Sequence, residues 1–204
     1  MTRSIFAHGL LGLTACGLVA ILAAPGCKAT GVGDPCIPEQ EYNQEFSGFD
    51  DKEVNIESKS FQCQTRVCLV YHFRGRVSCP YGQNPEGQGP AGGSACTVPG
   101  EKTPITGDPG DPNKALVRPQ CSDRTTDKAV YCSCRCANVD GKTDDGANYC
   151  SCPDGFTCQP LDLFPIPGQD TFLTGSYCVK SGTEYSPLKT CVAESCNPNG
   201  KQCH

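Results

Sequence analysis

Eighteen cysteines among 204 residues limit the folds open to this chain more than any other property of its sequence. Tryptophan is absent, and leucine, isoleucine, valine and phenylalanine make up only about one in six of the residues after Cys27. A chain so poor in large apolar residues does not bury enough surface to offset the entropy of folding. Disulfide bonds compensate, because each contributes about 2–4 kcal/mol. We therefore predict a small, irregular, disulfide-rich fold with short antiparallel β-hairpins and little helix after the N-terminal segment.

The N-terminal segment predicts export. Arg3 precedes an apolar run from about Leu10 to Ala24 that ends in small residues, which is the layout of a secretory signal peptide. The run is short for a membrane-spanning helix, which needs about 20 apolar residues, and an uncleaved anchor is the alternative. Exported compartments are oxidising, so the cysteines are expected to form disulfides rather than metal sites.

The end of this run carries two short boxes, LTAC at 13–16 and APGC at 24–27. Both resemble the signal of bacterial lipoproteins, in which the cysteine is lipidated and becomes the first residue. Cleavage before Cys27 uses the whole apolar run and leaves sixteen later cysteines, whereas lipidation of Cys16 leaves seventeen and therefore a spare thiol. The resemblance implies a lipid anchor on Cys27, with Cys16 as the alternative. Because Lys28 rather than aspartate follows, it also implies the outer membrane. Two or three acyl chains would make the attachment stable.

Composition divides the chain into five segments. Nearly half of residues 82–112 are glycine or proline, which is typical of a loop or linker, and Cys96 would pin it once. The segments are a signal peptide at 1–26, a lipidated tether at 27–35, a cysteine-containing β-hairpin module at 36–81, a Gly/Pro-rich linker at 82–120 and a denser cysteine-rich module at 121–204.

The predicted hairpin lies around Arg74-Gly75, where VCLVYHF and RVSCP flank a glycine that can take the positive φ of a tight turn. Its tip gathers His72, Arg74 and Arg76, which could contact an anionic partner or offer a basic residue to a trypsin-like protease. A solvated tip is the plainer alternative.

Cys132, Cys134 and Cys136 alternate along one segment. On an extended strand they would face one side, so three thiols would meet three different partners. The stretch CSCPDGF at 150–156 resembles the C-terminal half of an EGF-like domain, and this resemblance implies a disulfide-laced hairpin with an extracellular interaction role. The sequence does not choose among the possible pairings. The residues expected to form disulfides are Cys36, Cys63, Cys68, Cys79, Cys96, Cys121, Cys132, Cys134, Cys136, Cys150, Cys152, Cys158, Cys178, Cys191, Cys196 and Cys203.

Metal sites are weakly indicated. Asp140, Asp144 and Asp145 crowd the loop NVDGKTDDGAN, but their spacing departs from an EF-hand, so a solvated turn is favoured over weak calcium binding. A zinc or copper thiolate cluster at CSCRC lacks the usual C-x2-C spacing. No metal and no cofactor beyond the covalent lipid is expected.

Charge and motifs argue against two classes of function. A net charge of −5 argues against a nucleic-acid partner, and no catalytic motif favours an enzyme. We expect a membrane-anchored, extracytoplasmic lipoprotein that works as a binding or adhesion module for an envelope protein, surface protein or glycan. A protease inhibitor, a purely structural envelope protein and a secreted form without the anchor are the alternatives.

Overall fold

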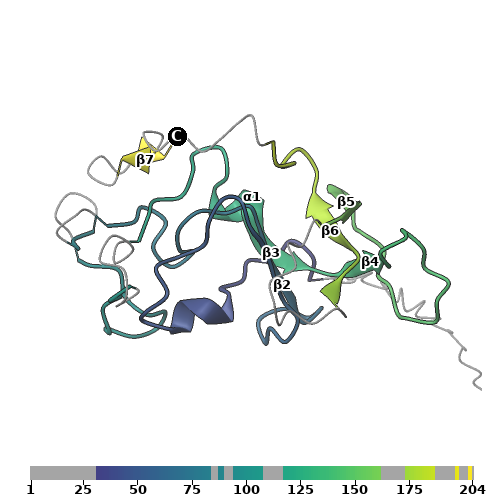
Figure 1. The fold of residues 1–204 in the computed structure, drawn as a ribbon, viewed down its shortest axis with the longest axis horizontal. Coiled ribbons are helices and arrows are strands. Elements are labelled where there is room, and N and C mark those ends of the chain that lie inside the picture. Colours follow the sequence, from purple (N-terminus) through teal and green to yellow (C-terminus); the bar gives the residue numbers. More distant parts are fainter. Residues whose placement is uncertain are drawn as a thin grey trace, which may run out of the picture.

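The structure, a computed structural model, confirms the predicted fold class. Most of the regular elements in the described residues are short antiparallel strands, joined by long irregular segments (Figure 1). The helical elements in this part of the chain are single turns, η1 at Glu39–Tyr42 and α1 at Thr126–Ala129. The described residues are 31–83, 87–89, 94–107, 117–161 and 173–186, together with the backbone of 196–197 and 202–203.

The strands form two three-stranded sheets and one short pair, with orders β1-β2-β3, β4-β6-β5 and β7-β8. A single residue, Cys134, separates β3 from β4, so one nearly continuous segment serves both larger sheets (Figure 1). The strands are β1 (Val54–Glu57), β2 (Val67–Tyr71), β3 (Val130–Ser133), β4 (Arg135–Ala137), β5 (Phe156–Pro160), β6 (Ser176–Lys180), β7 (Cys196–Asn197) and β8 (Gln202–Cys203).

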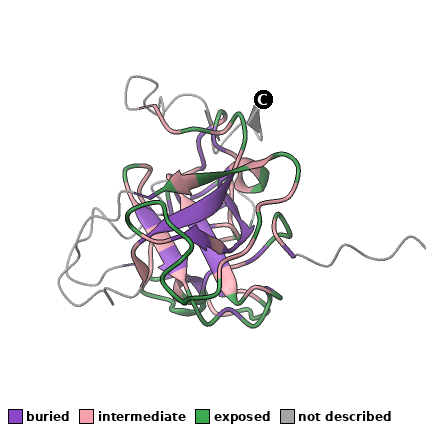
Figure 2. Cartoon of the chain, turned by 90° about the vertical axis from the view of Figure 1, so that its right-hand side faces the viewer, coloured by how far each residue is buried: buried purple, intermediate pink, exposed green. Residues whose placement is uncertain are grey.

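The first sheet lies between two buried clusters of side chains. Figure 2 shows buried strands in the interior of the molecule. Side chains alternate along a strand, so Cys68 and Val70 of β2 enter one cluster while Leu69 enters the other. Tyr131 of β3 joins Leu69, and Cys132 joins Cys68. Burial on both faces explains the unbroken apolar run of β2. Among the described residues, no helix has the length and hydropathy needed to cross a membrane.

The hairpin predicted around Arg74-Gly75 is wrong. β2 is the central strand, paired with β1 on one side and β3 on the other, so no edge of β2 is left for a returning strand. The chain instead turns away at His72, whose φ is 53°. Gly75 then bridges to Phe49. The module does contain an antiparallel strand pair, but β1 and β2 form it.

The two predicted cysteine-containing modules, 36–81 and 121–204, pack against one another. β3, from 121–204, shares a sheet with β1 and β2 from 36–81, and the Cys63–Cys132 disulfide joins them. The Gly/Pro-rich segment is cross-linked once, as expected, by the Cys79–Cys96 disulfide. A small buried cluster forms there from Cys96, Val98, Ile105 and Val117.

The second half of the predicted tether is docked on β3. The Gly33 amide donates to the Cys132 carbonyl oxygen at 2.8 Å, and the Cys132 amide donates to the Asp34 carbonyl oxygen at 2.7 Å. Residues 27–30 lie outside the described residues.

Candidate functional site

All thirteen cysteines whose side chains are described are disulfide-bonded. The CSCRC segment bonds three different partners, as its alternation predicted. Cys121 is bonded as well. Cys196 and Cys203 are register partners in β7–β8, and Cys191, Cys16 and Cys27 lie outside the described residues. The six pairs seen in full are Cys36–Cys68, Cys63–Cys132, Cys79–Cys96, Cys134–Cys150, Cys136–Cys158 and Cys152–Cys178.

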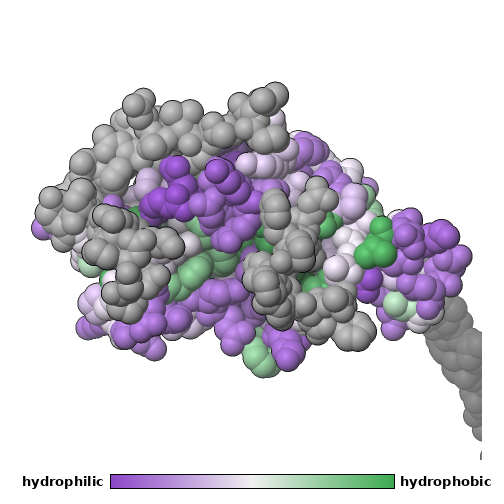
Figure 3. Space-filling view, in the orientation of Figure 1, coloured by the Kyte–Doolittle hydropathy of each residue, from purple (hydrophilic) through white to green (hydrophobic). Residues whose placement is uncertain are grey.

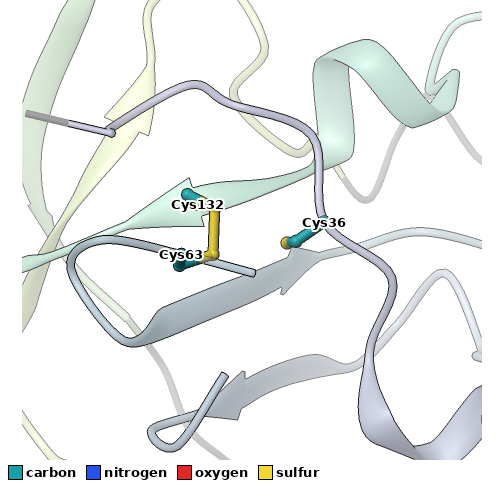
Figure 4. A group of neighbouring side chains, drawn as sticks. All are labelled: Cys36, Cys63 and Cys132. Atoms are coloured by element: carbon teal, nitrogen blue, oxygen red, sulfur yellow. A yellow bond between two sulfur atoms is a disulfide. The ribbon is translucent and has the colours of Figure 1, made fainter. Parts of the chain in front are cut away.

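Several disulfides lie side by side. The sulfur of Cys36 lies close to the Cys63–Cys132 bond (Figure 4). In the second sheet, the Cys178 sulfur is 3.7 Å from those of both Cys134 and Cys150. Three compact sulfur groups result, but each sulfur in them is already bonded to another, so none of them offers a thiolate as a metal ligand.

The structure contradicts the proposed contact role of the basic residues after β2. Arg74 and Arg76 are 7% and 0% exposed, and burial lowers the pKa of both guanidinium groups. The Arg76 guanidinium donates to the backbone carbonyl oxygens of Glu41 and Phe46 and forms an ion pair with the Glu41 carboxylate. His72 is half-buried and stacks on Tyr185, with ring centroids 3.7 Å apart. The contacts of these side chains are with other parts of the fold, so they stabilise the structure rather than face a partner.

The loop with the calcium candidates is an ordered turn. Asp145 accepts hydrogen bonds from the Tyr149 hydroxyl, the Asn138 side-chain amide and the Ala147 amide, which together lower its pKa to about 2. Asp140 and the other residues of the loop at 139–148 are exposed, and Val139 is 64% exposed. We call residues 138–149 the acidic loop. Besides Asp140 and Asp145 it carries Asp144 and a single basic residue, Lys142.

A second exposed loop connects β1 to β2. We call residues 58–66 the Phe61 loop. Phe61 is 88% exposed, the most exposed large hydrophobic side chain of the described residues. The Arg66 guanidinium lies over its ring, 4.6 Å from the centroid. The loop also carries Lys59 and no acidic residue, so its charge is opposite to that of the acidic loop.

The Phe61 loop is held in one conformation. Gln62 and Ile37 exchange two hydrogen bonds, at 3.0 and 2.8 Å. The next residue, Cys63, is bonded to Cys132. Within the loop the Ser60 amide donates to the Arg66 carbonyl oxygen at 3.0 Å. Phe61 therefore projects from a rigid support.

A hollow of about 470 Å³ borders this loop. Its apolar walls are Ile37, Phe61 and the half-exposed Tyr42, and its charged walls include Glu57. Burial raises the pKa of Glu57, and the negative charge of neighbouring Glu39 raises it further. The hydrogen bond that Glu57 accepts from the Glu39 amide acts in the opposite direction. On the face shown in Figure 3, the described surface is largely hydrophilic with small hydrophobic areas.

Sequence reasoning did not select the Phe61 loop. A signal was available, because Phe61 is a lone large apolar residue in the polar stretch SKSFQCQTR, directly before a bonded cysteine. Comparison of the chain with protein-family models, with curated proteins and with solved structures found no match.

Proposed function

We propose that this protein is an exported lipoprotein, anchored through Cys27, that holds a disulfide-stabilised binding module at the cell envelope. The observation that carries the proposal is that all thirteen cysteines with described side chains are bonded while exposed loops remain fixed around them. A cross-linked scaffold of this kind suits an oxidising compartment. It also presents loops that lose little entropy when they bind.

The acidic loop is the face we assign to the partner, an envelope or surface protein or a glycan. The Cys134–Cys150 disulfide closes its base, and the hydrogen bonds of Asp145 fix its interior. It carries three aspartates and an exposed apolar side chain, Val139. We do not favour the protease-inhibitor alternative, because Arg74 and Arg76, two of the three basic residues proposed for it, are buried.

Photo-crosslinking in producing cells tests this function. A photoreactive phenylalanine analogue replaces Val139 in one variant and Glu101, an exposed residue outside the acidic loop, in the matched control. We expect one discrete adduct from position 139 and none from position 101. The intact mass of the same purified protein should show a start at Cys27 with two or three acyl chains. Its sixteen later cysteines should be alkylated only after reduction. A chain without acyl groups would contradict the anchor, and equal adducts from both positions would contradict the binding face.

A further inference from the structure

We infer that the Phe61 loop is a membrane-contacting element, which seats the module on the anionic bilayer that carries its anchor, with the Phe61 ring in the headgroup region. This inference rests on the proposed lipidation of Cys27 and adds a second contact with the same bilayer.

The first argument is distance. Gly31 packs against the Phe61 loop, since a side-chain carbon added to Gly31 would lie 3.0 Å from Cβ of Gln64. Four residue steps connect Cys27 to Gly31, and they reach at most about 14 Å. Gly33 and Asp34 are hydrogen-bonded to β3, so the described chain offers no further slack. A lipid on Cys27 would therefore hold the Phe61 loop close to the bilayer surface.

The second argument is chemistry. Phe61 is 88% exposed, so its apolar ring remains in water and does not contribute the favourable free energy of burial. Lys59 and Arg66 flank it and are both exposed, and basic side chains beside an aromatic ring suit an anionic membrane interface. The acidic loop, which the same surface would repel, carries the opposite charge. Charge therefore favours the Phe61 loop over the acidic loop as the part that meets an anionic bilayer.

The third argument is rigidity. The Cys63–Cys132 bond and the paired hydrogen bonds between Gln62 and Ile37 fix the loop before it meets a membrane. A fixed ring loses little conformational entropy on insertion. A second attachment point also prevents the module from rotating freely about its lipid anchor.

The absence of tryptophan from the chain makes the test direct. Full-length lipidated protein carrying Phe61→Trp is reconstituted into vesicles of phosphatidylethanolamine and phosphatidylglycerol, with or without lipids brominated in their acyl chains. We expect a blue-shifted emission and about twofold quenching by the brominated lipid, as for a ring at the headgroup boundary. The control, Val139→Trp, should show neither effect. Equal quenching at both positions, or none at position 61, would overturn the inference.

A charge variant provides the second measurement. Lys59→Gln with Arg66→Gln, in the Phe61→Trp background, should reduce the quenching. Lys52→Gln with Lys102→Gln changes the net charge equally, at exposed positions outside both loops, and should leave the quenching unchanged. Equal effects of the two pairs would contradict the assigned role of the loop cations. If the mass shows acyl groups but position 61 is not quenched, this inference fails alone. If the mass shows no acyl groups, the anchor itself fails.

Discussion

Arg76 and Glu41 form a fully buried ion pair in a protein with very little apolar core. The Glu41 carboxylate also accepts hydrogen bonds from the Val77 amide and from the amide and hydroxyl of Ser78. One pair of side chains thereby fastens η1 to the segment after β2. Such a pair is costly to break, because removing one partner leaves an unpaired charge in the interior.

Replacement of Arg76 by methionine should therefore lower the free energy of unfolding by about 3–5 kcal/mol. The matched control is Arg118→Met, whose ion pair with Asp50 spans 2.8 Å but is about half exposed. An exposed pair contributes about 0–1 kcal/mol. Guanidinium denaturation of the oxidised proteins, followed by circular dichroism, measures both. A similar loss in the two variants would show that burial of the Arg76 pair has no special weight.

At the scale of elements, the loops are held by close contacts between backbone segments rather than by long strands or helices. Gly75 has a φ of 89° and pairs with Phe49 through two backbone hydrogen bonds of 2.9 and 3.0 Å. A side-chain carbon at this glycine would collide with the carbonyl oxygen of Arg118. Glycine is needed here both for its conformation and for its lack of a side chain.

Gly75→Ala and Gly141→Ala separate these two requirements. Gly141 also has a positive φ, 73°, but has open space around it, so its substitution should cost about 1–2 kcal/mol for the backbone conformation alone. Gly75→Ala should cost about 1–3 kcal/mol more, because the backbone of another segment must also move. Thermal unfolding of the two variants gives the difference. Equal costs would mean that the contact with Arg118 relaxes freely.

Local pattern predicted some elements and missed others for a physical reason. The alternation of Cys132, Cys134 and Cys136 correctly indicated three separate disulfide partners, because the direction of side chains along a strand is a local property. The hairpin at Arg74-Gly75 failed because a central and an edge strand have the same propensities. Only the long-range pairing of β2 with β3 makes β2 central. The Phe61 loop was missed for a related reason, since its exposure depends on what packs beside it.

Across the whole molecule, the disulfides differ in how far a reductant in solvent can reach their sulfur atoms. Cys36, Cys63, Cys68 and Cys132 are at most 2% exposed, so the two bonds that staple the first sheet are shielded from a reductant. Cys158 in the second sheet is exposed, and it is bonded to Cys136. Thiol–disulfide exchange requires a thiolate to reach a sulfur atom, so the order of reduction should follow exposure.

Brief treatment with dithiothreitol, followed by alkylation and peptide mapping, should label Cys136 and Cys158 first. Cys36, Cys63, Cys68 and Cys132 should be labelled only when the protein unfolds. The same treatment in guanidinium is the control, because unfolding should abolish the order. Early labelling of the first sheet in the native protein would mean that its staples open without global unfolding.

The bond between Cys63 and Cys132 spans 69 residues and joins strands from distant parts of the chain. If the exported chain enters the oxidising compartment from its N-terminus, Cys63 arrives there before the cysteine it needs. Cys36 and Cys68 are nearer in sequence and available sooner, so early oxidation can join Cys63 to the wrong one. Correct pairing then depends on a catalyst that exchanges disulfides. In a host without such a catalyst, mispaired disulfides rather than low solubility should limit the yield of native protein.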